Sequence, residues 1–157
     1  MAKNHINTLK IEILSPRVGR RGVCMEKKIQ ELKNKANPER WRAAINLGNY
    51  GEQAIDHLHE ALSDEDKWVR YFAVDTLGDI GHRKSVDPLI QMLLDADQDV
   101  RWVTAAALGK IGDPRAAHAL RQAYNSDNEF VKIFIEEALD KLAFEDLRSK
   151  TVAQSQG

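Results

Sequence analysis

Histidine and cysteine are the residue types most able to support metal or nucleophilic chemistry, and the chain contains five histidines and one cysteine. His59 is followed by Glu60, and an imidazole beside a carboxylate suits a non-haem iron site. The other histidines are scattered, at His5, His57, His82 and His118. Cys24 has no partner for an intrachain disulfide. These residues predict no metal site, no cofactor and no catalytic group, and therefore a protein that is not an enzyme.

A repeat with a period of 30 or 31 residues organises most of the chain. The stretch 69–81 recurs at 100–112, so that Arg70 corresponds to Arg101 and Gly78 to Gly109. A fixed period of this size is typical of stacked units, each too small to bury its own apolar face. Four units begin near Glu26, Gln53, Lys84 and Arg115. The sequence therefore predicts an all-α solenoid of about four helix pairs.

Each unit is predicted to contain two antiparallel helices. Apolar residues in the first half of a unit, such as Leu58 and Leu62, follow a helical period. Polar clusters with capping residues, at 63–66 and 95–97, then turn the chain. Val69 and Val100 begin the apolar stripe of the second helix in two successive units.

Glycines at fixed places in the repeat are predicted to have structural roles. Gly81 and Gly112 follow the last helical turn, where a left-handed residue ends a helix and glycine adopts this conformation without strain. Gly78 and Gly109 lie within the final turn, where the missing side chain allows neighbouring helices to approach closely.

The ends of the chain depart from the repeat. Residues 1–24 match no unit and carry a net positive charge, which predicts a disordered basic arm; alternatively, Met25 is the physiological start. The repeat domain is expected to span residues 25–147. Glu136 replaces an apolar residue in the fourth unit, as expected for a polar terminal repeat. Residues 148–157 are predicted to be a frayed polar tail.

A helical wheel of the second helices leaves aromatic and charged residues facing away from the core. The candidate binding residues are Trp41, Trp68, Tyr71, Phe72, Asp75, Asp79, Trp102, Val103, Lys110 and Phe134. Ile45, Phe130 and Ile133 occupy the same face of the first and last units. Aromatic side chains are frequent interface anchors. The alternative interpretation is that these rings only stack on one another between repeats.

Arg70 and Arg101 occupy a fixed place in the repeat, and we expect them to join neighbouring units rather than to bind an anion. Their predicted partners are the inter-helix carboxylates Asp66 and Asp97.

Composition narrows the class of partner. Lysine and arginine number 23 against 24 aspartates and glutamates, which does not favour a wide nucleic-acid-binding surface. The sequence contains neither a signal-peptide pattern nor a long apolar run, which predicts a cytoplasmic protein without a membrane partner.

Residues 97–116, DQDVRWVTAAALGKIGDPRA, resemble the short HEAT-like repeat of phycobilin lyase subunits, and the resemblance covers about residues 26–143. It implies a right-handed α–α superhelix whose second helices line a concave binding face. The resemblance also brings enzymatic alternatives. Deoxyhypusine hydroxylase, a HEAT-like enzyme, uses several His-Glu dipeptides, whereas the positions equivalent to His59-Glu60 are Ile90-Gln91 and Arg121-Gln122.

The sequence thus favours a non-enzymatic scaffold that binds another protein through its second helices. The alternative is an accessory subunit of a cofactor-attachment enzyme, such as a bilin lyase, or of a protein-modifying enzyme. HEAT-like DNA glycosylases use a cationic concave face, whereas acidic and basic residues are mixed on this one. A second copy of the chain is a further candidate partner.

Overall fold

The computed structural model describes residues 20–155, which form helices and short connections. The elements are α2 (Arg20–Lys33), α3 (Trp41–Leu47), η1 (Gly48–Ala54), α4 (Ile55–Ala61), α5 (Lys67–Ile80), η2 (Arg83–Ser85), α6 (Val86–Met92), α7 (Gln98–Ile111), α8 (Ala116–Ser126) and α9 (Glu129–Ser155). Four helix pairs follow one another along the chain, so the predicted all-α HEAT-like solenoid is confirmed.

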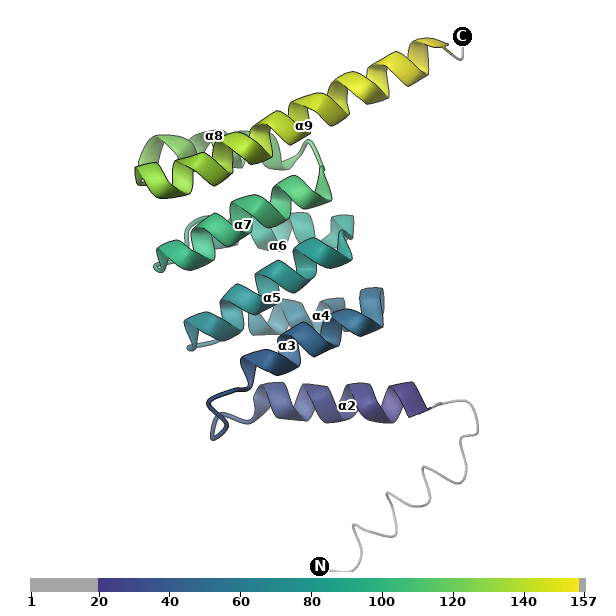
Figure 1. Ribbon diagram of the computed structural model, residues 1–157, viewed down its shortest axis with the longest axis vertical. Coiled ribbons are helices and arrows are strands. Elements are labelled where there is room, and N and C mark those ends of the chain that lie inside the picture. The colour runs from purple at the N-terminus through teal and green to yellow at the C-terminus, as the bar shows by residue number, and fades with distance from the viewer. Residues whose placement is uncertain (1–19, 156–157) are drawn as a thin grey trace, which may run out of the picture.

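The helices form two layers (Figure 1). The second helices α3, α5, α7 and α9 lie side by side, and α4, α6 and α8 lie behind them. Neighbouring second helices make the most extensive contacts, α5 with α7 and α7 with α9. The core between the layers contains fully buried leucines and valines from successive units, among them Leu58, Leu77 and Leu108. Each unit therefore completes its core against the next one, as expected for a repeat protein.

Capping residues fix where the second helices begin and end. The carboxylates of Asp66 and Asp97 accept hydrogen bonds from backbone N–H groups in the first turns of α5 and α7. Gly81 and Gly112 end these helices with φ angles of 70° and 71°. The predicted left-handed glycine caps are present in the structure.

Glycines inside the last turns let the second helices touch. A Cβ atom added to Gly78 would lie 2.7 Å from the Cβ of Ala107, and one added to Gly109 would lie 3.0 Å from the Cα of Ala138. The expected close approach of neighbouring helices therefore exists at both positions.

The helices of the structure extend beyond both predicted ends of the repeat domain. The described helix α2 begins at Arg20 rather than after residue 24, and Gly22 lies within it. A helical glycine costs about 1 kcal/mol, which burial of Ile29 and Leu32 on the same helix can offset. The predicted arm at residues 1–19, and with it the question of the start, lies outside the described residues.

At the other end, α9 continues through the predicted boundary at residue 147 to Ser155. Residues 148–155, predicted to fray, are helical because no glycine or proline interrupts the sequence between Glu129 and Ser155.

Candidate protein-binding surface

Seven aromatic side chains from the four second helices form a continuous row, which we call the aromatic row. Trp41 stacks on Phe72 with ring centroids 4.7 Å apart, and Phe72 meets Tyr71 at 5.0 Å. Tyr71 packs edge-on against Trp102 at 5.5 Å, and Trp102 contacts Phe134 at 4.6 Å. Trp68 and Phe130 complete the row. Inter-repeat stacking, the alternative interpretation of these residues, therefore does occur.

The row has an inner and an outer part. Trp41, Tyr71, Phe72, Trp102 and Phe134 are half-buried and pack on the hydrophobic core. The outer part is exposed, with 45% of Trp68 and 50% of Phe130 accessible to solvent. Two aliphatic residues of the same second helices, Ile45 and Ile133, are also exposed, at 46% and 59%. Stacking between repeats therefore leaves several large apolar side chains uncovered on the second-helix face.

Val103 is a wrong prediction, because its side chain is only 2% exposed. Its helix α7 packs between α5 and α9. The short side chain of Val103 does not reach past the larger residues of these two flanking helices. Phe72 and Phe134, at the corresponding places in the adjacent units, are larger and remain partly exposed.

The predicted charged residues of the face come together. The ammonium group of Lys110 lies 3.0 Å from the carboxylate of Asp75 and 2.8 Å from that of Asp79. Burial opposes the charge of Lys110, but hydrogen bonds to Asp79 and Asp75 outweigh burial and raise the pKa of Lys110.

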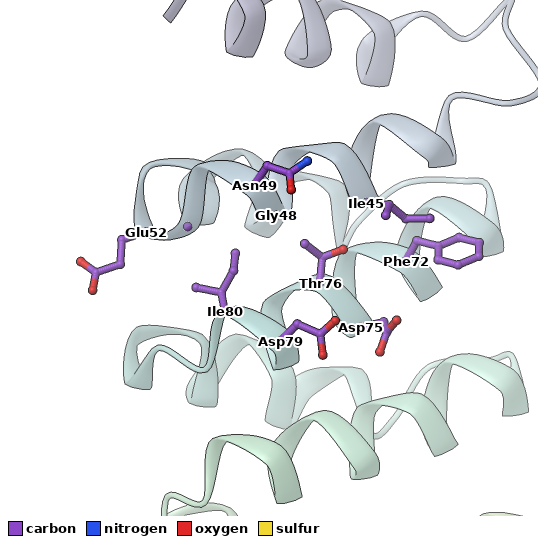
Figure 2. A pocket seen from close by; sticks show the side chains of 10 residues that line it. Ile45, Gly48, Asn49, Glu52, Phe72, Asp75, Thr76, Asp79 and Ile80 are labelled. Carbon is purple, nitrogen blue, oxygen red and sulfur yellow. The ribbon is translucent and has the colours of Figure 1, made fainter. Parts of the chain in front are cut away.

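A pocket of about 400 Å³ opens between α3, η1 and α5, beside the aromatic row (Figure 2). Ile45, Phe72 and Ile80 supply apolar walls, and Asp75 and Asp79 supply carboxylates. This pocket is not among the features expected from the sequence. The sequence does contain a feature that indicates the pocket. Asp79 occupies the position that is lysine in the next two units, Lys110 and Lys141.

The predicted partners of the repeat arginines are wrong. Arg70 binds Asp95 at 2.7 and 3.0 Å, and Arg101 binds Asp127 at 2.6 and 2.9 Å. Each arginine thus reaches the inter-helix turn of the following unit, whereas Asp66 and Asp97 are occupied as helix caps.

Arg40 makes the same contact with Asp64, which extends the series to the first unit. The three pairs together are called the arginine–aspartate ladder below. The expectation that Arg70 and Arg101 join neighbouring units agrees with this geometry.

The histidines do not converge on a site. His59 Nε2 lies 3.2 Å from the hydroxyl of Ser85, and burial lowers the pKa of His59. Within residues 20–155, no three His, Cys, Asp or Glu side chains are grouped as metal ligands. Among the described helices, none combines the length and hydrophobicity of a transmembrane segment.

Comparison with protein families finds a match to the model of HEAT repeats, over residues 25–101 and 55–140. A search of curated proteins finds no match. The solved structures that are similar over about three quarters of the chain include the following three. Human deoxyhypusine hydroxylase is 29% identical, with a TM-score of 0.69 over 76% of this chain and 43% of that one.

The complex of CpcE and CpcF of phycocyanin lyase from Nostoc sp. PCC7120 is also 29% identical, with a TM-score of 0.68 over 78% of this chain and 54% of that one. An engineered protein shares the fold at 19% identity, with a TM-score of 0.57 over 76% of this chain and 62% of that one. The chain thus spans about half the length of the two natural proteins.

Proposed function

The chain belongs to the family of HEAT repeat proteins, and from this premise we propose that it is a non-enzymatic scaffold that binds another protein through its second-helix face. The observation that carries the proposal is the exposed outer part of the aromatic row together with the exposed isoleucines on the same helices. Trp68, Phe130 and Ile133 lie on a face whose inner rings already pack on the core. Side chains of this size each bring about 150–250 Å² to an interface, and a contiguous exposed apolar patch is typical of a binding site.

The charges on this face favour a protein over a nucleic acid. Lys67 pairs with Asp97 and Asp99 at 3.1 and 3.0 Å, and Lys141 pairs with Glu137 at 2.7 Å. Lys110 is held by two aspartates in the same way. Phosphate binding requires cations that can exchange small counterions for phosphate groups, and these lysines already have carboxylate partners.

The test is capture of a partner by the immobilised chain from extracts of the native source, followed by repetition with purified partner. The double variant Trp68→Ser/Ile133→Ser removes exposed side chains without opening the core. We expect it to weaken binding at least about tenfold, because two anchors of an interface are lost. The control Leu94→Ser removes a residue that is 79% exposed and lies after α6, away from the second helices.

Equal capture by the parent, the double variant and the control would contradict the proposal. Circular dichroism of all three must show the same helical content, so that a loss of binding reports on the surface and not on folding. Trp102→Ala is a poorer test, because Trp102 packs on the core and its removal also lowers stability.

An accessory subunit of a cofactor-attachment or protein-modifying enzyme is the second candidate. It is favoured by the similarity to the CpcE and CpcF complex, at 29% identity over 78% of this chain. The two candidates differ in the partner: an accessory subunit would copurify with an enzyme and raise its rate, whereas a scaffold would not change it. Bound pigment, or iron after anaerobic purification, would also favour the enzyme-associated class.

A further inference from the structure

Three gaps separate the four second helices. A lysine side chain covers the α5–α7 gap and another covers the α7–α9 gap, whereas no lysine of the described part of the chain covers the α3–α5 gap. The Lys110 side chain covers the α5–α7 contact, with its Cδ 3.6 Å from the place where a Cβ of Gly78 would stand. Lys141 covers the α7–α9 contact at Gly109 with the same 3.6 Å spacing. At the α3–α5 contact the corresponding residue is Asp79, whose side chain is two atoms shorter. A Cβ at Gly48 would meet only Thr76.

This difference explains why the pocket lies at the α3–α5 gap (Figure 2). Its walls are the surfaces on which an alkyl chain would pack: Ile45, Gly48, Phe72 and Ile80. The pocket holds about 400 Å³, enough for a long unbranched side chain.

The polar groups of the pocket accept hydrogen bonds. The Asn49 amide donates to the carbonyl of Asn46 at 3.2 Å, so its oxygen is available at the rim. Asp75, Asp79 and Glu52 add carboxylates, and none of the lining residues is lysine or arginine. Thr76 also lines the pocket and is only 6% exposed. The rim of the pocket therefore offers oxygen acceptors and no cationic side chain of its own.

We propose that this pocket receives a lysine side chain of the partner protein, which covers Gly48 as Lys110 covers Gly78. The inference rests on the proposed function, because the pocket adjoins the aromatic row. The alkyl stem packs on Ile45, Phe72 and Ile80, and the ammonium group donates to the rim carboxylates. The charge agrees: three carboxylates line the pocket and a single lysine, Lys110, pairs with two of them, so an excess of negative charge remains.

The probe is N-acetyl-lysine N′-methylamide, titrated into the full ¹⁵N-labelled chain and followed by NMR. Saturable shifts of the Gly48, Asn49 and Gly51 amide signals are expected. The Nε-acetylated probe and the norleucine analogue keep the stem but lose the charge, and we expect them to bind at least about tenfold more weakly. Equal shifts with the norleucine analogue, or no shift with lysine, would overturn the proposal.

Two charge-matched variants locate the site. Asp79→Lys gives the α3–α5 gap the lysine that the next two gaps contain, so it should fold and abolish the response. Asp140→Lys makes the same charge change on exposed α9 and should leave the response intact. A response that survives in folded Asp79→Lys would contradict the assignment. The probe analogues decide the question even where a variant fails to fold.

Failure of this inference is distinguishable from failure of the scaffold proposal. If lysine does not bind but Trp68→Ser/Ile133→Ser abolishes partner capture, only the lysine pocket is wrong. If capture is unaffected by the double variant, the scaffold proposal is wrong whatever the probe shows.

Discussion

At the scale of single residues, three arginines repeat one contact. Arg40, Arg70 and Arg101 each form two hydrogen bonds with an aspartate of the following unit. Arg70 and Arg101 also donate to backbone carbonyls of their own inter-helix turns, such as those of Asp64 and Asp95. A guanidinium with its five donors can tie two turns together in this way, whereas an ammonium cannot make the planar two-bond contact.

Asp127→Asn is predicted to lower the free energy of unfolding by about 1–3 kcal/mol, because the half-buried Arg101 loses its charged partner. Asp127 is only 6% exposed at its side chain, so water replaces the lost contact poorly. Asp87→Asn is the control: it breaks the exposed Arg115–Asp87 pair and should change stability by less than about 1 kcal/mol. Urea unfolding of both variants measures the difference, and equal effects would contradict the account of the ladder.

The same aspartate predicts the direction of the pH dependence. Hydrogen bonds from Arg101 lower the pKa of Asp127, although burial opposes this effect. A carboxyl group whose pKa is lower in the folded state stabilises that state above its unfolded pKa of about 4, and the contribution disappears as the pH falls further. The Tm of the parent should therefore drop between neutral pH and pH about 3 more than that of Asp127→Asn. Parallel Tm curves would contradict this assignment.

The sequence analysis predicted that these arginines join neighbouring units, but it predicted the wrong aspartate partners. Asp66 is near Arg70 in the sequence, whereas Asp95 belongs to the next unit. Which turn an arginine reaches depends on the offset between stacked units, and periodicity alone does not determine that offset. The role of Asp66 as a helix cap was readable from its position before the helix.

At the scale of elements, the contact between second helices depends on glycine facing alanine. Gly78 faces Ala107, and Gly109 faces Ala138. These small residues bring the helices together and so align the aromatic row on one face.

Gly78→Ala is predicted to destabilise the protein by about 1–3 kcal/mol, despite the better helix propensity of alanine, because the new methyl group would lie 2.7 Å from the Cβ of Ala107. Gly109→Ala is the graded comparison: its closest contacts are 3.0 and 3.1 Å, so the loss should be smaller. Thermal unfolding of both variants shows whether Gly78→Ala lowers the Tm more than Gly109→Ala does. A rise in Tm for Gly78→Ala would show that helix propensity outweighs packing.

Element types and core stripes followed from the 31-residue period, but three features did not. Val103 was placed on the exposed face because a wheel of one helix ignores the flanking helices. The extension of α9 to Ser155 lacks an apolar stripe that would have indicated a packed helix. The pocket beside Asp79 arises from a missing lysine stem, which becomes apparent only when helix spacing is known.

At the scale of the whole molecule, contacts run between adjacent units, which makes stability a sum of local terms. Helices α5 and α7 have a second helix on each side, whereas α2 lies at the end of the array (Figure 1).

Native-state amide exchange is predicted to be slowest in α5 and α7 and faster in α2, because the terminal unit can open without breaking two interfaces. Mass spectrometry of peptic fragments resolves these helices. Uniform protection from α2 to α9 would contradict the model of local opening and indicate a single cooperative unit.

The most direct test of the central claim uses the three tryptophans, Trp41, Trp68 and Trp102, which all belong to the aromatic row. Their indole N–H groups give one NMR signal each in the ¹⁵N-labelled chain, assignable by single substitutions. On addition of purified partner, we predict that the signal of the exposed Trp68 shifts or broadens most. The signals of the half-buried Trp41 and Trp102 should change less. Unchanged indole signals under conditions in which the complex has formed would contradict binding through the second-helix face.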